Sequence, residues 1–256
     1  MRTSLQFWYI RFIRLVLRRR FMPVMHGPLK GKQWTTSMNY DYLTGTYLGE
    51  DEIRSMQHAL AAPGAAFYDI GANVGYFSLS VAVLFPHVNI MAFEPVEEHL
   101  RLFRQHMDLN DIHRIQIFPM AVAGHTGKVM FSNLGKHEGN TYKKDSALVE
   151  EGVFSIAVDA TTVDDFVAAG NKPPSLLKID VEGAELDVLK GAKQTLEQYH
   201  PDILLATHDV HIAGIRQACV DFLEGMGYSL TPVGAHNKAF AGLDDYFATY
   251  KPAISN

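Results

Sequence analysis

One short segment limits what this chain can fold into more than any other. Residues 66–70 form an apolar run interrupted only by Asp69, and a turn containing Gly71 and Gly75 follows before an apolar stretch with helical spacing. A strand, a glycine turn and a helix in this order are typical of the first unit of a doubly wound α/β sheet that binds a nucleoside. Glu94 ends the next apolar run, where its carboxylate can accept hydrogen bonds from both ribose hydroxyls.

The turn differs from that of a dinucleotide site. Such a site has three glycines, the second of which lets a pyrophosphate approach the helix N-terminus. Asn73 stands at that position here, and a Cβ at Gly71 or Gly75 would restrict the backbone or block the approach of a ligand. The pattern from Asp69 to Gly75 is similar to the first motif of S-adenosylmethionine-dependent methyltransferases, in which the turn meets the methionine part of the ligand.

Strands and helices are expected to alternate along the chain. After residues 66–70, further strands are predicted at 88–93, 115–118, 176–180 and 203–206, with helices at 50–60, 73–84, 96–109 and 211–226. This alternation is typical of a parallel sheet with crossover helices. The runs 227–231 and 246–250 are expected to pair as an antiparallel hairpin at one edge, and 129–132 and 154–158 as added strands around a polar loop.

The predicted fold class is therefore α/β. It is a Rossmann-like, doubly wound, mostly parallel seven-stranded sheet with an antiparallel hairpin at one edge, as in class I methyltransferases, and with an N-terminal helical extension. We expect two parts: a basic extension of an amphipathic helix and a loop, residues 1–48, and a methyltransferase domain, residues 49–256.

Charge separates these two parts of the chain. Residues 1–32 carry eight of the 23 lysines and arginines and no acid, whereas the remainder carries 15 basic and 28 acidic side chains. An acidic body argues against a nucleic-acid substrate, because phosphate contacts supply most of that affinity. The single cysteine, Cys219, excludes a disulfide framework and favours a reducing, cytoplasmic location.

The helix expected over residues 5–20 has several open roles. Arg11, Arg14 and Arg18 form one stripe, and apolar side chains occupy the opposite arc. The apolar runs are too short to span a bilayer, and we do not expect a signal peptide. Such a helix can lie on an anionic membrane surface, pack on its own domain, or pack on a second subunit. Peripheral membrane contact and homo-oligomerisation are both open alternatives.

Three sequence blocks together resemble the FkbM-type methyltransferases. They are residues 69–77, 93–95 and 177–185, of which the last is the most family-specific, and the resemblance covers about residues 45–250. It implies an S-adenosylmethionine-dependent O-methyltransferase, a class of which many members modify hydroxyls of sugars or polyketides. On the matching positions the residues expected to bind the cofactor are Asp69, Gly71, Asn73, Gly75, Glu94, Pro95, Ala121 and Asp180.

These positions imply different contacts within the site. The turn would meet the methionine end, Glu94 the ribose and Ala121 the adenine, while Asp180 would lie on the rim of the pocket beside the sulfonium. The family commonly has an acid near the end of the fifth core strand. This chain has Thr207, His208 and Asp209 there, which leaves the identity of the base open.

Methyl transfer from a sulfonium is an in-line displacement, so the protein mainly aligns an oxygen with the methyl carbon. The acceptor alcohol must also lose its proton, and a neutral imidazole with an ordinary pKa of about 6.5 can accept it. We predict His208, at the expected carboxyl edge of the sheet, as a catalytic residue that serves as base or substrate ligand. Asp180 is the second predicted catalytic residue, orienting that histidine or binding a substrate hydroxyl.

A divalent metal is an alternative that the sequence does not favour. Mg²⁺ or Mn²⁺ accepts the oxygen and nitrogen ligands that this region offers, from Asp180, Glu182, His208 and Asp209. Acids near a helix N-terminus also occur simply because the helix dipole favours them, and we assign Glu185 to that case.

The acceptor is expected at polar loops. The side chains predicted to bind it offer donors, acceptors and an aromatic face suited to a sugar, and they are Asn133, His137, Asn140, Tyr142 and His211. The predicted activity is O-methylation of a sugar, glycolipid or related small metabolite. Two alternatives remain. One is a nicotinamide-dependent oxidoreductase, although this chain lacks the second turn glycine of such enzymes, and the other is a non-catalytic, membrane-attached nucleoside-binding module.

Overall fold

The computed structural model describes residues 20–37, 40–133, 141–142, 154–209, 212–234 and 243–251. The basic helix expected over residues 5–20 lies outside the described residues, apart from Arg20. His137, Asn140 and His211 also lie outside them. Among the described helices, none has the length and apolar character needed to cross a bilayer.

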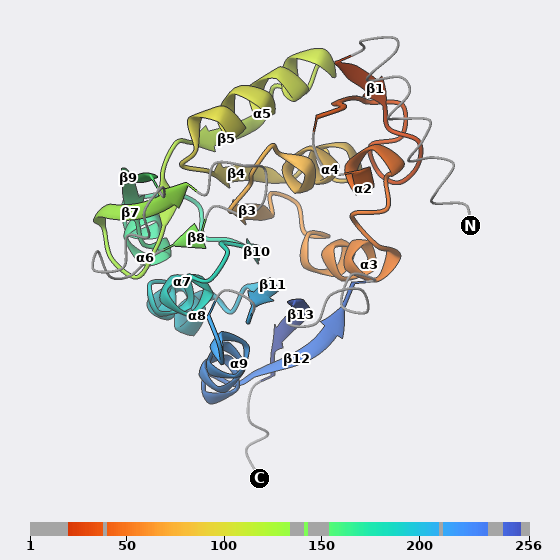
Figure 1. Ribbon diagram of the computed structural model, residues 1–256. Coiled ribbons are helices and arrows are strands. Elements are labelled where there is room, and N and C mark those ends of the chain that lie inside the picture. Colours follow the sequence, from red (N-terminus) through yellow and green to blue (C-terminus); the bar gives the residue numbers. More distant parts are fainter. Residues whose placement is uncertain are drawn as a thin grey trace.

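A seven-stranded sheet forms the centre of the molecule (Figure 1). Its strands in spatial order are β12 (Tyr228–Val233), β13 (Leu243–Tyr250), β11 (Asp202–His208), β10 (Leu176–Ile179), β3 (Ala66–Ile70), β4 (Asn89–Phe93) and β5 (Ile115–Phe118). From β11 to β5 every neighbouring pair is parallel, whereas β13 is antiparallel to both β11 and β12. The predicted doubly wound fold with an antiparallel edge pair is confirmed. The last strand of the chain, β13, lies between the edge strand β12 and β11.

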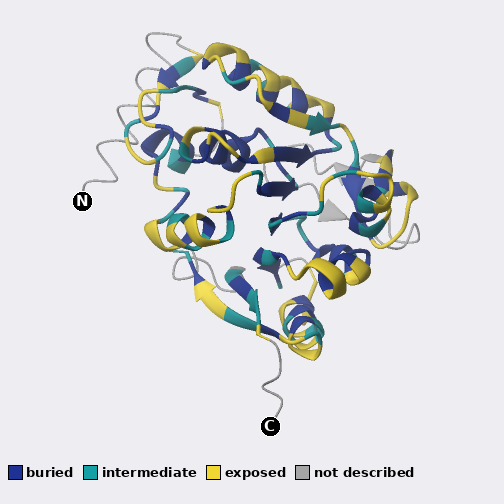
Figure 2. Ribbon diagram, turned by 180° about the vertical axis from the view of Figure 1, so that it is seen from behind, coloured by how far each residue is buried: buried dark blue, intermediate teal, exposed yellow. Residues whose placement is uncertain are grey.

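Helices cover both faces of this sheet. One face carries α3 (Glu50–Ala59), α4 (Tyr76–Leu84) and α5 (Glu97–Leu109), and the other carries α6 (Val163–Ala168), α7 (Glu185–Lys190), α8 (Lys193–Tyr199) and α9 (Ile215–Gly225). Alternate residues of β3 point to opposite faces: Phe67 packs in the first layer, and Tyr68 and Ile70 pack in the second. Figure 2 shows the inner strands of the sheet buried, whereas the edge strand β12 and the outer helix faces are partly exposed.

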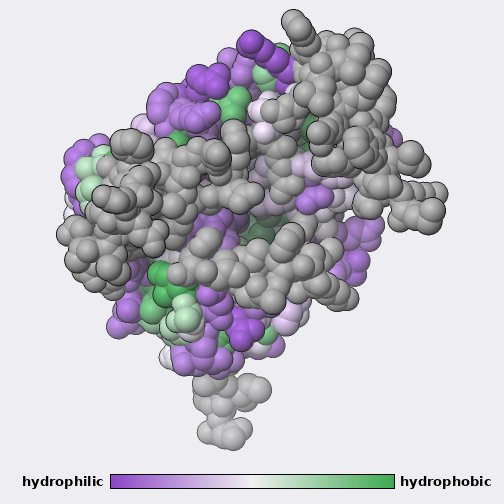
Figure 3. All heavy atoms as spheres, viewed as in Figure 1, coloured by the Kyte–Doolittle hydropathy of each residue, from purple (hydrophilic) through white to green (hydrophobic). Residues whose placement is uncertain are grey.

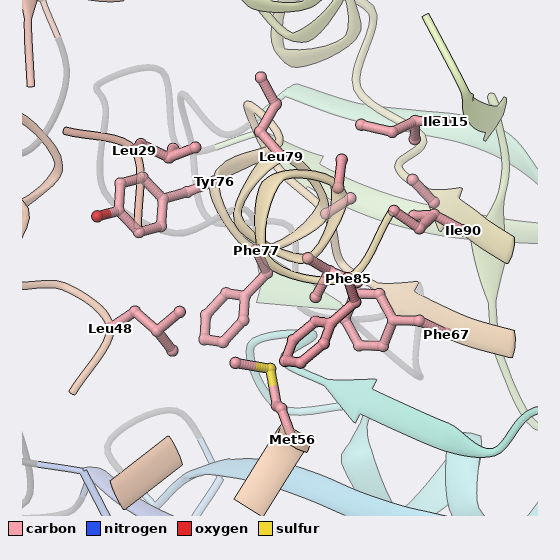
Figure 4. Packing of buried hydrophobic residues seen from close by; sticks show 14 of the residues in the cluster. Leu29, Leu48, Met56, Phe67, Tyr76, Phe77, Leu79, Phe85, Ile90 and Ile115 are labelled. Atoms are coloured by element: carbon pink, nitrogen blue, oxygen red, sulfur yellow. The ribbon is translucent and has the colours of Figure 1, made fainter. Parts of the chain in front are cut away.

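Helix α4 is buried almost throughout, because it is enclosed by elements on several sides. Every residue from Tyr76 to Ala82 is buried, which explains a helix with no charged residue. In Figure 4, Phe77 and Phe85 share one cluster with Met56 of α3. The surface drawn in Figure 3 is mainly hydrophilic in its described part, with small separate hydrophobic patches.

The N-terminal segment is more ordered than the predicted loop. It contains an antiparallel pair, β1 (Phe21–Pro23) and β2 (Gln33–Thr35), and a short helix, α2 (Tyr40–Thr44). Trp34 is fully buried and stacks on the ring of His106 in α5, with centroids 3.8 Å apart. The side chain of Asn110 accepts a hydrogen bond from the Gln33 N–H at 2.7 Å and donates to its carbonyl at 2.9 Å. The described part of the chain between residues 20 and 48 therefore contributes to the same core as β3 and α4.

A second sheet lies beside α6 (Figure 1). Its strands, in the order β6, β9, β7 and β8, are Ala121–Val122, Phe154–Thr161, Gly127–Asn133 and Thr141–Tyr142. The two added strands predicted from the sequence are confirmed as parts of β7 and β9. Strand β8 falls within the stretch that the sequence predicted as a polar loop.

Candidate active site at the carboxyl edge of the sheet

Four neighbouring strands bring the predicted site residues to one edge. Glu94 follows β4, Gly71 follows β3, Asp180 follows β10, and His208 is the last residue of β11. From β3 the chain continues to β4 and β5 on one side, whereas β10 and β11 lie on the other. Ligands of doubly wound sheets bind outside the carboxyl ends at such a reversal of strand order.

The turn after β3 is bonded to the neighbouring strand. The N–H groups of Gly71 and Ala72 donate to the Phe93 carbonyl at 3.1 and 3.0 Å. Asn73 has a left-handed backbone, with φ of 50°, and its N–H donates to Oε2 of Glu94 at 2.8 Å. Its side-chain Oδ1 is buried and accepts no hydrogen bond from the described residues. A buried acceptor of this kind suits a ligand that brings a donor, such as an ammonium group.

Contacts within the protein explain the two turn glycines. Gly71 has φ of 78°, and a Cβ there would lie 1.9 Å from the carbonyl oxygen of Asp180. Gly75 has φ of 90°, and a Cβ there would lie 2.2 Å from Cδ2 of Phe103. The sequence predicted that a Cβ at either position would restrict the backbone or block a ligand; the positive φ values confirm the first reason, and close packing within the chain is a further one. The left-handed backbone of Gly75 also explains why α4 begins at Tyr76 and not at Asn73 as predicted.

Glu94 is buried and already holds the local backbone. Its Oε1 accepts from the Val96 N–H at 2.9 Å and lies 3.1 Å from Nδ1 of His99, and its Oε2 accepts from the Asn73 N–H. An ionised carboxylate offers about four acceptor positions, so capacity remains for a ribose hydroxyl. The sequence placed Glu94 correctly at the edge but gave no sign of these local bonds.

Two other residues predicted to bind the cofactor, Pro95 and Ala121, have apolar side chains. Pro95 directly follows Glu94 and is half-buried. Ala121 is buried at the start of β6 and packs with Ala123 and Val129 of the second sheet. Their contact with the cofactor stays a prediction.

Asp69 is fully buried on β3 and acts through its neighbours. Its Oδ2 accepts from the Ser78 hydroxyl at 2.6 Å, and its Oδ1 lies 3.2 Å from the ammonium nitrogen of Lys178. The same ammonium group donates to the Gly71 carbonyl at 2.8 Å and lies 3.5 Å from Oδ2 of Asp180. Burial alone would lower the pKa of Lys178, but the charges of Asp69 and Asp180 raise it above its usual value, so the group stays charged.

Lys178 is a site residue that the sequence reasoning missed. The available signal is a single lysine inside an otherwise apolar strand, since a buried charge needs a partner. In the parallel register Lys178 lies opposite Asp69. It therefore joins the turn after β3 to the acid after β10.

His208 lies among three carboxylates. Its Nδ1 is 2.7 Å from Oε1 of the fully buried Glu185, and its Nε2 is 3.5 Å from both Oδ1 of Asp180 and Oε2 of Glu182. Glu185 also accepts from the Gly183 N–H at 2.9 Å. The assignment of Glu185 to the helix dipole alone was therefore incomplete, because this residue orients His208.

The charge state of His208 follows from these contacts. Burial lowers its pKa, but the hydrogen bond to Glu185 and the charges of Asp180 and Glu182 outweigh burial and raise the pKa to about 9. With these partners alone, the imidazole is protonated at neutral pH. The neutral imidazole that the sequence analysis assumed is reached only at higher pH, and a role for His208 as base stays a prediction.

Three groups at this edge have the chemistry of metal ligands. One ligand atom each from Asp180, Glu182 and His208 lies within 4.8 Å of the other two. Asp209, the fourth ligand considered from the sequence, is engaged elsewhere: its Oδ1 accepts from the Arg216 N–H at 2.8 Å, near the start of α9. The described part of the edge thus brings three of the four predicted ligands together.

The predicted acceptor-binding residues are only partly placed. Asn133 ends β7 opposite Phe154, and Tyr142 lies in β8 opposite Phe131. Neither strand belongs to the central sheet. Their contact with an acceptor stays a prediction, as does that of His137, Asn140 and His211.

The fold and its carboxyl edge define a class I methyltransferase architecture. The chain belongs to the FkbM methyltransferase family, since the sequence pattern described as "Methyltransferase FkbM domain" matches residues 69–230, more than half of the chain. This membership favours the methyltransferase prediction over the nicotinamide-dependent alternative.

Several known proteins are similar to this chain. Methyltransferase 1 of Beauveria bassiana is 28% identical over 53% of the chain, and 31-O-demethyl-FK506 methyltransferase FkbM of Streptomyces tacrolimicus is 26% identical over 71% of the chain and 78% of its own length. Hexuronic acid methyltransferase AglP of Haloferax volcanii is 26% identical over 58% of the chain. The chain spans 60% of the length of the Beauveria protein and 59% of the Haloferax protein.

A solved structure shows the same fold. The crystal structure of methyltransferase FkbM from Methylobacillus flagellatus KT matches with a TM-score of 0.51 and 18% identity, covering 73% of this chain and 44% of that protein. At this identity the likeness concerns the fold alone.

Proposed function

We propose that this protein is an S-adenosylmethionine-dependent O-methyltransferase that acts on a hydroxyl of a sugar, glycolipid or related small metabolite. The observation that carries the proposal is the position of Asp180. Its backbone N–H donates to the Ile70 carbonyl at 3.1 Å, directly before the turn, and its side chain lies 3.5 Å from His208. The turn expected to hold the methyl donor and the polar groups able to hold an acceptor are therefore adjacent.

The residues at the edge divide into a donor side and an acceptor side. On the donor side, Oδ1 of Asn73 would accept from the ammonium group of the cofactor and Glu94 from its ribose hydroxyls. When bound, S-adenosylmethionine supplies a methyl group activated on its sulfonium. On the acceptor side, Asp180 and His208 would bind the hydroxyl and align its oxygen, which is the main requirement of an in-line displacement.

The names of two relatives support the choice of acceptor. The Streptomyces tacrolimicus relative is named for an O-linked methyl position, and the Haloferax volcanii relative is named for a hexuronic acid. Both names concern hydroxylated acceptors. Extending this class to the present chain is part of the proposal, because fold and family leave the acceptor open.

Methyl transfer measured with purified full-length protein tests the proposal. We expect radiolabel from S-adenosylmethionine to enter a panel of saccharides that includes hexuronic acids. The variant His208→Ala should bind the cofactor normally but transfer methyl about a hundredfold more slowly, because the acceptor hydroxyl loses a group that aligns its oxygen. His113→Ala, which removes an exposed histidine, is the matched control.

Two results would contradict the proposal. Binding of S-adenosylmethionine with no transfer to any hydroxylated acceptor would favour the non-catalytic module. A His208→Ala variant that transfers methyl at the wild-type rate would show that His208 does not bind or align the acceptor.

A further inference from the structure

The most suggestive group of side chains in the described structure is the convergence of two carboxylates and one imidazole at the ends of β10 and β11. The Nε2 of His208 lies 3.5 Å from one oxygen of Asp180 and 3.5 Å from one oxygen of Glu182. Ligands that share an ion at roughly 2.1 Å are about 3–4 Å apart when they are adjacent in its coordination shell. We propose that Asp180, Glu182 and His208 bind a divalent cation, a ligand that the sequence analysis did not favour.

Neighbouring residues orient two of the three ligands. His208 is held through Nδ1 by the fully buried Glu185, which leaves Nε2 directed at the two carboxylates. Asp180 lies near Lys178 through Oδ2, which leaves Oδ1 on the side of His208. A histidine that binds a metal almost always passes its other ring N–H to a carboxylate or carbonyl, because this bond fixes the ring and its tautomer. The pair of His208 and Glu185 has this arrangement.

A second observation points to missing positive charge. Oε2 of Glu185 is buried and receives no hydrogen bond from the residues that the structure describes. Three carboxylates surround His208, while the nearby ammonium group of Lys178 is shared between Asp69 and Asp180. Buried carboxylates are normally paired or bound to metals, and a divalent ion that replaces the imidazole proton of His208 would add one positive charge to this cluster. The side chains of Asp180 and Glu182 are 21% and 30% exposed, which leaves a route for the ion.

The ligand set indicates the kind of ion. Two carboxylate oxygens and one imidazole nitrogen are acceptable to Mn²⁺, and the oxygens also suit Mg²⁺. Three protein ligands leave positions for water or substrate. In the reaction proposed above, on which this step rests, an acceptor hydroxyl bound to the ion would lose its proton to water more readily. Its oxygen would then form a bond to the methyl carbon as the carbon–sulfur bond breaks, with His208 serving as a ligand and not as the base.

Binding of Mn²⁺ alone tests this site independently of catalysis. Free Mn²⁺ gives a six-line electron paramagnetic resonance signal that weakens when the ion binds protein. Titration of full-length, chelator-treated protein should show one site per chain, competed by Mg²⁺. Asp180→Asn, Glu182→Gln and His208→Gln should each weaken binding at least about tenfold, and Glu185→Gln by about 10- to 100-fold as an orienting residue. Glu197→Gln, which alters an exposed acid on α8, should bind like the wild type.

Other outcomes separate the two proposals. A wild-type signal unchanged by protein, or equal affinity in wild type and Glu182→Gln, would overturn the cation site. Thermal unfolding of each variant shows whether a loss reflects misfolding, and Glu182→Gln is the mildest change because its side chain is partly exposed. Methyl transfer that continues in the presence of a chelator would show that the cation has no role in catalysis, and the methyltransferase proposal would still hold. Absence of cofactor binding would refute that proposal without affecting the Mn²⁺ result.

Discussion

The ammonium nitrogen of Lys178 lies 3.2 Å from Oδ1 of Asp69, and both side chains are buried within the central sheet. The two residues face each other on adjacent parallel strands. Ser78 holds the second oxygen of Asp69, while Lys178 also reaches the Gly71 carbonyl and Asp180. This ion pair therefore supports the turn on the donor side and the acid on the acceptor side together.

Replacing Lys178 by methionine should destabilise the fold strongly. The change leaves Asp69 buried without its counter-charge, and breaking a buried pair in this way typically costs about 3–5 kcal/mol. Urea unfolding measures the loss. Lys193→Met, at an exposed ion pair with Glu197, is the control and should leave the free energy of unfolding almost unchanged. Equal stability of Lys178→Met and wild type would show that the pair does not support the sheet.

Gly75 can be tested against a glycine with the same backbone conformation. Gly75 and Gly170 have φ of 90° and 93°, but a Cβ would strike Phe103 at Gly75, whereas no atom lies within 4 Å at Gly170. Alanine at Gly170 should cost about 1–2 kcal/mol from backbone strain alone. Alanine at Gly75 should cost about 1–3 kcal/mol more from overpacking. If denaturant unfolding gives equal losses, the contact with Phe103 is easily relieved.

His106 should make stability depend on pH. Its Nε2 accepts from the Thr35 N–H at 3.2 Å, so the proton sits on Nδ1, which donates to the Val74 carbonyl at 3.0 Å. Burial is the main cause that lowers its pKa to about 4. Because this value lies below the unfolded pKa of about 6.5, the stabilisation is complete above pH 6.5 and is lost as pH falls toward 4, by on the order of 3 kcal/mol.

Urea unfolding at pH 7.5, 5.5 and 4.5 checks this slope. The variant His106→Gln should lose stability at pH 7.5 and show a smaller decline on acidification. An NMR titration of the folded protein gives the pKa directly, and titration of His106 near pH 6.5 would contradict the prediction.

The central sheet could be predicted because its strands are continuous apolar runs separated by turn residues. Strands β3 and β5 have the predicted ends. Strand β11 extends to His208, two residues beyond its predicted end, since it pairs with β13 as far as Leu243. Such extensions depend on a partner strand far along the chain, which local pattern does not reveal.

The site was predictable in position but not in its contacts. Acidic residues at the ends of the predicted strands indicated that the site lies at the carboxyl edge of the sheet. Asp180 and His208 do lie close together there. The contacts of Lys178 with Asp69 and of Glu185 with His208 join segments distant in sequence. The N-terminal hairpin was missed for the same reason, because Trp34 is ordered by its stacking on His106.

Calorimetric titration of S-adenosylmethionine into the full-length protein tests the central claim most directly, that the turn at Asn73 and the acid at Glu94 hold the methyl donor. We predict one site per chain, with affinity lowered at least about tenfold in Glu94→Ala and unchanged in Glu97→Ala, which removes an exposed acid of the adjacent helix. Failure of the wild type to bind S-adenosylmethionine, or equal affinity in wild type and Glu94→Ala, would contradict the account.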